Sequence, residues 1–308
     1  PTWQRFLNPV ALASSDNIGE SKINNKHFGG NMSLNYDFHF IKGLQAKIGA
    51  SYQSYSTLNK NVAKEYKIYE YNPDTDTYTE HRKNSPSSIS NSMNDDNMLT
   101  LQAMLMYSQT FAQKHKVDAT FAYEQHKYWS RYSSLSREYD VYTKDQVNMA
   151  SLNNMKNSGV EEERASLSFI GRLNYEYDSK YLVEMAFRED GSYRYAPGHR
   201  WGFFPVVSAG WRISKEPWMS HVGWIDELKL RASVGLVGED AGEPFQYVSG
   251  YSLTGGSGYE FINDKWLTGA SSPSITNELL TWYTSNTKDI GITTAFFSNR
   301  LTFEFDVY

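Results

Sequence analysis

The chain has 308 residues, a formal net charge of −5 at pH 7 and no cysteine. The missing cysteines exclude a disulfide framework, a thiolate metal site and a cysteine nucleophile, and a mildly acidic chain without a basic stripe is not typical of a nucleic-acid-binding protein. Aromatic residues make up 15% of the sequence, but no run of eighteen apolar residues occurs, which excludes a membrane-spanning helix. The chain opens at PTWQRF without a Met or a leader and closes inside an alternating pattern, so we expect an internal piece of a longer polypeptide.

Alternation of polar and apolar residues with a period of two dominates the chain and predicts an all-β protein. Residues 28–40 show this alternation first, with apolar side chains at even-numbered positions: Phe28, Met32, Leu34, Tyr36, Phe38 and Phe40. The same test along the chain predicts ten strands: 28–40, 44–57, 97–110, 116–130, 164–176, 180–191, 203–213, 226–236, 282–297 and 300–308. Most are longer than the roughly 5–6 residues of an ordinary strand and reach the roughly 9–11 that a tilted strand needs to cross a bilayer.

The connections between these strands alternate in length. Short ones fall at 41–43, 111–115, 177–179, 214–225 and 298–299. Long ones fall at 58–96, 131–163, 192–202 and 237–281. An antiparallel chain places alternate connections at opposite ends of its sheet, so we expect short periplasmic turns at one end and long extracellular loops at the other, as in an outer-membrane barrel.

Aromatic residues gather at the ends of the predicted strands, where an amphipathic ring prefers the boundary between hydrocarbon and water. Those beside the short turns are Phe38, Phe40, Tyr175, Tyr181 and Trp211. Those beside the long loops are Tyr52, Trp129, Trp201, Phe203 and Trp282. Core packing in a soluble all-β protein is the alternative, but strand length and loop sorting favour a transmembrane antiparallel β-barrel segment. Its expected lipid-facing row includes Val183, Met185, Phe187, Leu228, Leu230 and Val234.

Two stretches resemble a known family. YEYDSKYLVEMAFREDGSYRYAPGHRWGFFPVVSAGWRISKEPWM, followed by LKLRASVGLVG, and the later LLTWYTSNTKDIGITTAFFSNRLTFEFDVY are similar to the barrel signature of SusC/RagA-type TonB-dependent transporters of Bacteroidetes outer membranes. The match is specific over about 175–237 and 279–308 and weaker before them. One departure is Tyr283, which stands where the family often has Glu after its Trp.

The resemblance implies a barrel of about 22 strands, closed by an N-terminal plug and importing glycan or peptide fragments with energy delivered by TonB on the periplasmic side. It also implies a SusD-like surface lipoprotein as a lid over the barrel. On this interpretation residues 1–308 are part of one TonB-dependent receptor β-barrel domain in the outer membrane. The plug domain and the remaining strands lie outside this chain.

No catalytic signature is found: the sequence has no G-x-S-x-G, H-E-x-x-H, P-loop or G-x-G-x-x-G motif, so we predict that the protein is not an enzyme and uses no cofactor. The histidines show no metal-ligand spacing; they are His27, His39, His81, His115, His126, His199 and His221. We expect His39 and His126 to line a polar lumen. Asp74 and Asp76 are two apart, as in calcium loops, but the Gly and distal Glu of an EF-hand are missing, so a solvated loop tip is expected.

Charged residues of the polar parity have two possible roles. Arg172, Glu176, Glu184, Arg188, Asp190, Lys229 and Arg231 could contact the substrate or the plug, but we expect them mainly to form cross-strand charge pairs that stabilise a wet barrel wall. The run Glu161, Glu162, Glu163 is expected to be a solvated loop end rather than a docking patch. No substrate-binding residue is identified; loops 58–96, 131–163 and 237–281 are the candidates for contact with ligand or lid.

Three functions stay open at this point. An active importer is favoured by the resemblance, a passive porin would need no plug, and a soluble carbohydrate-binding or adhesive β-domain is the third. A plug with a TonB box elsewhere in the polypeptide would decide for active import.

Overall fold

A computed structural model describes residues 9–262, 265–272 and 275–308. The chain divides into two compact units. The first unit combines the residues up to 31 with 51–99 and 127–164, and the second combines 32–50, 100–126 and 165–308. None of the described helices has the length and apolar composition that spanning a membrane requires.

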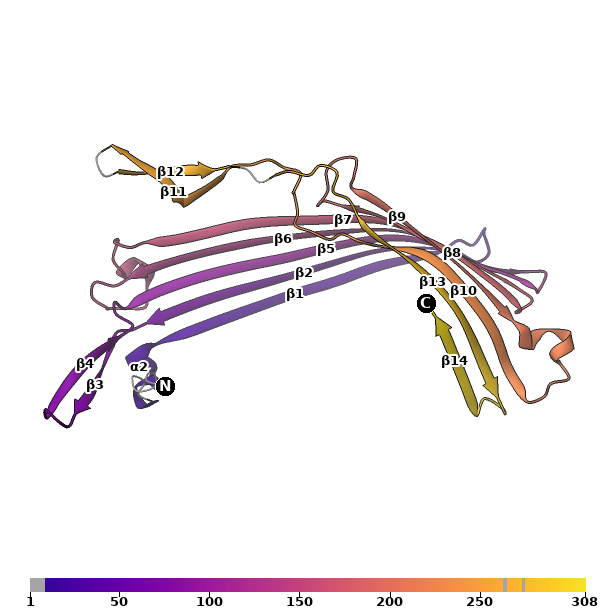
Figure 1. The fold of residues 1–308 in the computed structure, drawn as a ribbon, viewed down its shortest axis with the longest axis horizontal. Coiled ribbons are helices and arrows are strands. Elements are labelled where there is room, and N and C mark those ends of the chain that lie inside the picture. The colour runs from indigo at the N-terminus through magenta and orange to yellow at the C-terminus, as the bar shows by residue number, and fades with distance from the viewer. Residues whose placement is uncertain (1–8, 263–264, 273–274) are drawn as a thin grey trace. The chain divides into compact units, whose positions relative to one another are not determined.

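Ten of the described strands form one antiparallel sheet and follow one another in chain order. They are β1 (Gly19–Asp37), β2 (Leu44–Ala63), β5 (Ser88–Phe111), β6 (His115–Glu138), β7 (Lys156–Tyr177), β8 (Tyr181–Ser192), β9 (Trp201–Arg212), β10 (Ile225–Glu239), β13 (Tyr283–Phe296) and β14 (Leu301–Val307). β8, β9, β10, β13 and β14 lie side by side (Figure 1). β1 and β14 are the two edges and do not pair with each other, which confirms the predicted open segment of an antiparallel barrel.

Several strand boundaries differ from the predictions. β1 begins at Gly19 instead of 28 and ends at Asp37, which leaves Phe38 to Phe40 in the following turn. β5 and β7 also begin earlier than expected, and β6 continues to Glu138. The added residues are mostly polar on both parities, as in the segment SISNSMNDD of β5, where Ile89 and Met93 are the two apolar residues. A period-two pattern requires two different environments on the two faces, so it gives no signal where both faces are polar.

The long connections, which the sequence pattern predicts to be loops, contain regular structure. β3 (Tyr66–Asn72) and β4 (Thr77–Lys83) form a hairpin inside 58–96, and β11 (Ser252–Ile262) pairs with β12 (Lys265–Ser271) inside 237–281. The connection from β6 to β7 holds a short 3-10 helix, Val147–Met149. Further short helices are α1 (Pro9–Leu12), α2 (Ser15–Ile18), Ile213–Lys215 and Pro217–Met219.

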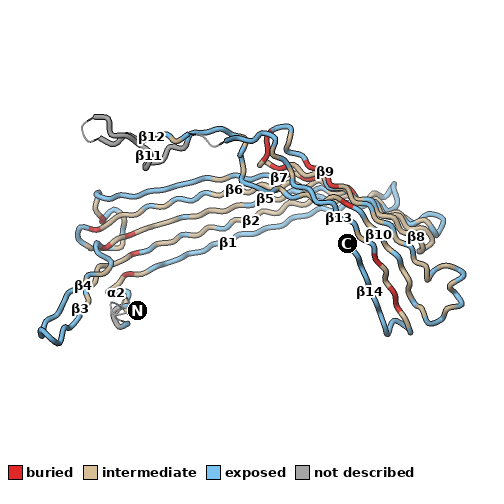
Figure 2. The backbone as a smooth tube through the Cα atoms, viewed as in Figure 1, coloured by how far each residue is buried: buried red, intermediate tan, exposed pale blue. Residues whose placement is uncertain are grey.

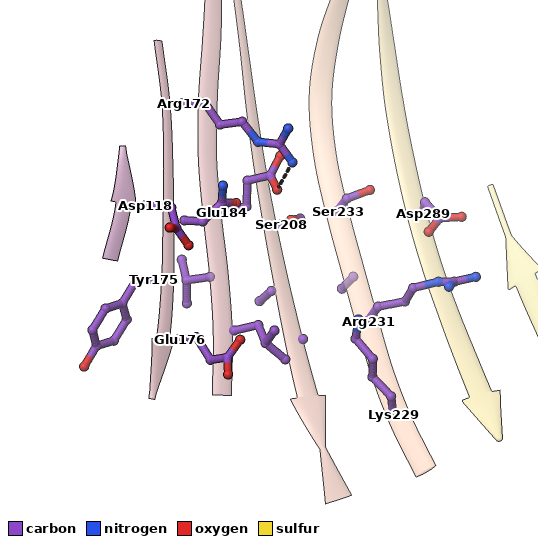
Figure 3. Close-up of a pocket in the computed structure, with 16 residues that line it drawn as sticks. Asp118, Arg172, Tyr175, Glu176, Glu184, Ser208, Lys229, Arg231, Ser233 and Asp289 are labelled. Atoms are coloured by element: carbon purple, nitrogen blue, oxygen red, sulfur yellow. Dashed lines mark hydrogen bonds and ion pairs between the residues drawn. The ribbon is translucent and has the colours of Figure 1, made fainter. Parts of the chain in front are cut away.

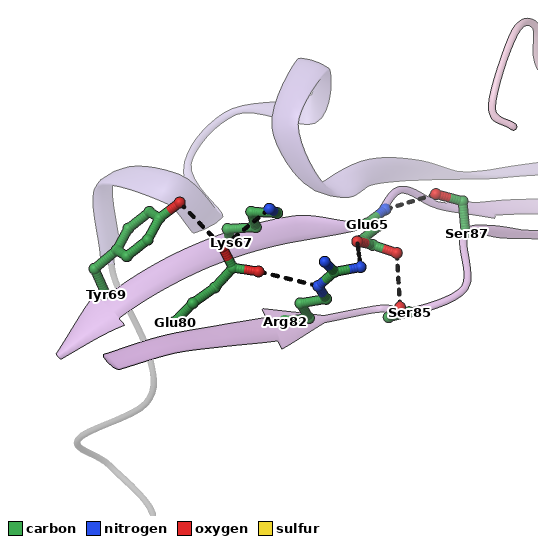
Figure 4. A network of polar contacts seen from close by, with 7 residues as sticks. All are labelled: Glu65, Lys67, Tyr69, Glu80, Arg82, Ser85 and Ser87. Carbon is green, nitrogen blue, oxygen red and sulfur yellow. Dashed lines mark hydrogen bonds and ion pairs between the residues drawn. The ribbon is translucent and has the colours of Figure 1, made fainter. Parts of the chain in front are cut away.

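A polar network holds the base of the β3–β4 hairpin in the first unit (Figure 4). Glu80 accepts hydrogen bonds at 3.0 Å from both Lys67 Nζ and Arg82 Nε. Glu65 accepts one at 2.6 Å from Ser85 Oγ and lies 3.4 Å from Arg82. The two cations hold the pKa of the Glu80 carboxyl below its usual value through hydrogen bonds, that from Lys67 being the stronger. The predicted loop is therefore an ordered hairpin.

The core of the first unit lies where the ends of β2 and β5 meet the connection between β6 and β7. Val62, Ile89, Tyr139 and Ala150 are buried together, and Tyr142 and Val147 pack against them. Tyr139 also donates a hydrogen bond from its hydroxyl to the Lys144 carbonyl at 2.9 Å. Figure 2 shows how few positions along the chain are buried, as expected for a sheet whose faces meet solvent rather than a second layer.

The strands of the second unit pair in a register that sorts their side chains onto two faces, because directly paired residues share a face. One row runs Leu173, Met185, Val207 and Val234 from β7 to β10. The neighbouring row on the opposite face runs Asn174, Glu184, Ser208, Ser233 and Asp289 from β7 to β13. Met185 and Val234 are 52% and 48% exposed, so the apolar face of this sheet is uncovered, as predicted for the lipid side.

Candidate functional site

The polar face of the second unit forms an open hollow of about 420 Å³. It runs across β7, β8, β9, β10 and β13, and its labelled charged residues project from neighbouring strands (Figure 3). The lining residues that carry charge are Asp118, Arg172, Glu176, Glu184, Lys229, Arg231 and Asp289. Five of these seven had been predicted from the sequence to line the lumen.

Cross-strand charge pairs lie in this hollow, as predicted. Arg172 Nη2 on β7 is 2.8 Å from Glu184 Oε2 on β8. Arg231 on β10 reaches across β13 to Asp306 on β14, with Nε and Oδ1 3.0 Å apart, and also contacts Glu304. Gly291 permits this contact, since a Cβ there would lie 1.9 Å from Asp306 Oδ1. The pairs stabilise the register of a wet wall at about 0.2–1 kcal/mol each.

The remaining predicted wall charges behave differently from one another. Arg188 pairs mainly along its own strand, with Nε 2.7 Å from Asp190 Oδ2, and lies 4.0 Å from Glu124. Glu176 lies 4.0 Å from Arg212. Lys229 makes no ion pair within 4.0 Å among the described residues, and its Cε lies 3.3 Å from where a Cβ would stand on Gly210. The predicted cross-strand pairing thus holds for some of these charges but not for all of them.

A cluster at the short-turn end shows how the aromatic girdle is anchored. Glu216 accepts hydrogen bonds from Tyr181 Oη at 2.7 Å and from Trp211 Nε1 at 3.0 Å, while the two rings stack with centroids 6.5 Å apart. The Tyr181 hydrogen bond, followed by that of Trp211, holds the pKa of the Glu216 carboxyl below its usual value. The two rings lie on the apolar face, and their polar atoms point to a carboxylate. This arrangement suits a membrane–water boundary, where one end of an aromatic side chain meets hydrocarbon and the other meets water.

One predicted girdle residue, Trp282, is on the wrong face for that role. Its ring packs against Phe204 with centroids 5.3 Å apart and lies over Gly202. Gly202 and Phe204 pair with Asp190 and Arg188, so they belong to the polar face. The interfacial assignment of Trp282 is therefore wrong, because a Trp at a strand end can turn to either face and sequence position does not say which.

The three consecutive glutamates lie on β7 and are not a loop end. Glu161 Oε1 is 2.8 Å from Arg131 Nε, and Glu162 Oε1 is 2.6 Å from Arg164 Nε. Glu163 Oε2 is 3.3 Å from Lys127 Nζ, on the strand β6. The prediction of a loop end was wrong, since a strand with both faces in water can carry charges on consecutive residues.

Asp74 and Asp76 lie at the turn of the β3–β4 hairpin, consistent with a solvated tip. The Asp74 backbone N–H donates to Asn72 Oδ1 at 3.0 Å, and the Tyr71 hydroxyl donates to Asp76 Oδ1 at 3.0 Å. The sequence contains the signal for this hairpin, since NPDT stands between two strand-like runs, but 58–96 was predicted as one loop.

Four of the histidines have described partners on the strands: His27 stacks on Tyr55, and His81 lies 3.1 Å from Glu70 Oε2. His126 lies 2.8 Å from Glu124 and 3.0 Å from Thr100 Oγ1, and His115 lies 2.8 Å from the Tyr175 hydroxyl. Within the described residues no group of three or more His, Asp or Glu side chains could hold a metal ion. The three loops proposed for ligand or lid contact hold no identified substrate residue, and the side chains of 252–268 lie outside the described part.

Comparison with known proteins places these features in a family. The protein-family model described as TonB dependent receptor-like, beta-barrel matches residues 2–308. The TonB-dependent receptor SusC of Bacteroides thetaiotaomicron is 27% identical over the whole chain, which spans 29% of SusC. TonB-dependent receptor P39 of Formosa agariphila is 31% identical over 66% of the chain, which corresponds to 19% of P39.

A solved structure shares the fold. The RagAB peptide transporter aligns with a TM-score of 0.75 and 19% identity, over 93% of this chain and 30% of that one. The chain thus spans less than a third of the length of these relatives. The match over residues 2–308 agrees with the open ten-stranded sheet and with its separate polar and apolar faces. The chain therefore belongs to the TonB-dependent receptor β-barrel family of the outer membrane, and it resembles the SusC/RagA-type members.

Proposed function

We propose that the full-length protein imports glycan or peptide fragments across the outer membrane with energy delivered by TonB. The observation that carries the proposal is the polar, charge-paired wall opposite an apolar face, in a chain that belongs to a family of transporters and receptors, not of enzymes. In a membrane barrel the apolar face meets lipid, and the polar face bounds an aqueous path.

Residues 1–308 form part of one barrel domain in this proposal, and the plug and the other strands come from the rest of the polypeptide. The two edges of the sheet support the presence of further strands. β1 and β14 each have one described neighbour, and an unpaired backbone N–H or C=O group in hydrocarbon costs several kcal/mol. Further strands of the same barrel would satisfy both edges.

A SusD-like surface lipoprotein covers the long-loop end in this proposal, and TonB acts from the short-turn end. The similarity to SusC and to the RagAB peptide transporter supports the assignment. Cross-linking of the native complex should place the lipoprotein on the connections 64–87, 139–155, 193–200 and 240–282. Cross-links to 41–43, 177–179 or 298–299 would reverse the orientation.

The experiment that tests the function measures uptake by cells of the native host. Maltodextrin and casein-peptide mixtures are supplied to the wild type and to a strain lacking the full-length gene, with and without a protonophore. Active import predicts uptake that needs both the gene and the proton gradient. Uptake that survives the protonophore would indicate a passive porin, and recovery of the protein from the soluble fraction would indicate a soluble β-domain.

A further inference from the structure

The connection between β8 and β9 contains some of the most buried residues of the second unit. Tyr195 is 1% exposed, Ala196 is also buried, and so is Ser192 at the end of β8. An outer loop of a barrel is expected to project into water, where its side chains would be exposed. The segment 193–200 must therefore pack on another part of the second unit.

The ring contacts show on which face it packs. The Tyr195 ring lies 5.8 Å from the Trp282 ring, which in turn lies 5.3 Å from the Phe204 ring. Phe204 pairs in register with Arg188, so it projects from the polar face. Neither Gly202 nor Gly238 could carry a side chain, since a Cβ would lie 2.4 Å or 2.0 Å from the Phe204 ring. Segment 193–200 thus lies over the inner, polar wall at the long-loop end.

Hydrogen bonds from the two ends of the connection 240–282 fasten the segment in place. Trp282 Nε1 donates to the Arg200 carbonyl at 2.9 Å, and Thr281 Oγ1 donates to the His199 carbonyl at 3.1 Å. On the other side, Asp240 accepts a hydrogen bond from Ser192 Oγ at 3.0 Å and lies 3.3 Å from Arg194 Nε. Arg194 also donates to the Gly242 carbonyl.

The segment closes on itself as well. The Ser192 backbone N–H donates to the Arg200 carbonyl at 3.0 Å, and Arg200 Nε donates to the Tyr195 carbonyl at 3.1 Å. Its two ends are therefore joined, and the aromatic cluster and Asp240 hold it from two directions. A loop held in this way has few alternative conformations, because opening it would expose Tyr195 and break several hydrogen bonds together.

We propose that residues 193–200 form a fixed strap on the inner wall, which narrows the long-loop end of the barrel and limits the size of the fragments that enter. Trp282 and Asp240 are positioning residues that hold the strap. The size limit rests on the import function proposed above, whereas the fixed position of the strap does not. The two parts can therefore fail separately.

The fixed position is tested by hydrogen exchange of the full-length transporter in detergent. The amides of Ser192 and His199 should exchange slowly in the wild type, and Trp282→Ala and Asp240→Ala should each speed their exchange roughly tenfold. Tyr283→Ala is the matched control, since Tyr283 is the next residue and is exposed. Fast exchange of these amides in the wild type, or equal rates in all variants, would overturn the strap.

The size limit is tested by the length of the compounds that the native complex captures. Wild type and variants are offered maltodextrin and casein-peptide ladders, and the bound compounds are identified by mass spectrometry. Release of the strap should shift the captured lengths upward in both variants and not in Tyr283→Ala. Unchanged lengths in variants with accelerated exchange would overturn the size limit. If the wild type captures nothing from either ladder, both the import function and the size limit are contradicted. The fixed position of the strap is then tested by hydrogen exchange alone.

Discussion

Strand β7 belongs to two environments within its 22 residues. In the part assigned to the first unit, Glu161, Glu162 and Glu163 project alternately to both faces and each meets a cation. In the part assigned to the second unit, Arg172 is paired on the polar face while Leu173 lies exposed on the apolar face. The difference teaches that polar and apolar residues alternate only where the two faces of a strand meet two different solvents. A strand can continue where both faces meet water, but its sequence then shows no alternation.

The two units also differ in where their stability comes from. The first unit has a small core at the ends of its strands and in the β6–β7 connection, around Ile89 and Tyr139. The second unit leaves Met185 and Val234 uncovered, so its apolar face requires lipid. Substitutions should therefore act through packing in the first unit and through the bilayer in the second.

The largest expected effect is the loss of the core of the first unit. Ile89 is fully buried, so Ile89→Ala should cost about 2–5 kcal/mol in the stability of that unit. Leu152→Ala is the control, because Leu152 is 71% exposed. Limited proteolysis of the full-length protein should show faster cleavage within 139–155 for Ile89→Ala only. Equal cleavage of both variants would contradict the core assignment.

The bilayer dependence of the second unit should appear almost as strongly. Met185→Arg should destabilise the folded barrel by roughly 2–4 kcal/mol if residue 185 lies near the midplane. Val160→Arg, on the part of β7 with two polar faces, should change stability by less than about 0.5 kcal/mol. Urea titration of the full-length protein in lipid vesicles measures both. Similar costs for the two variants would remove the distinction between the units.

A smaller effect is expected on the polar wall. Gly291→Ala places a Cβ against Asp306 and Arg231, and the ion pair between them must move. The pair is partly exposed, so the loss should be about 1 kcal/mol or less. A double-mutant cycle with Arg231→Gln is the sharper measurement, since Gly291→Ala should cost much less once the guanidinium is gone. Additive effects would mean that Gly291 does not act through this pair.

The smallest effect is a dependence on alkaline pH confined to the first unit. The hydroxyl of Tyr142 donates to Asp145, and this hydrogen bond, followed by burial, raises the pKa of Tyr142 from 10.0 to about 12. A raised pKa favours the protonated form in the folded state, so its stabilisation is complete below pH 10 and is lost between about pH 10 and 12. The free energy of unfolding of the first unit, measured by urea titration of the full-length protein, should fall over this window. Tyr142→Phe should remove the pH dependence; its persistence would assign it to another group.

Much of the second unit could be predicted from the sequence, because two solvents impose a period of two on its strands. Met185 and Leu230 were placed on the exposed apolar face and Arg172 and Glu184 on the polar wall, and the structure confirms these positions. The resemblance to SusC/RagA-type transporters likewise depended on strands of this unit, from Tyr175 onward.

The rest escaped prediction for physical reasons. The first 9 residues of β1 before Phe28 and the segment around Glu162 have no alternation, because both faces are polar. The β3–β4 hairpin is defined by local pairing and a turn, which a search for membrane-length strands passes over. The inward packing of Tyr195 and Trp282 depends on tertiary contacts between connections far apart in the chain, and the sequence pattern carries no signal of their direction.

The most direct test of the account is a scan of solvent accessibility along two strands. The chain has no cysteine, so single cysteines placed at 183–188 of β8 and at 158–163 of β7 can be spin-labelled in the full-length protein in lipid, once any cysteine outside this chain has been replaced by serine. Labels at 183, 185 and 187 should collide with oxygen dissolved in the bilayer, and labels at 184, 186 and 188 with a polar nickel reagent, whereas every β7 label should favour the polar reagent. Uniform accessibility along β8, or alternation along both strands, would contradict the account.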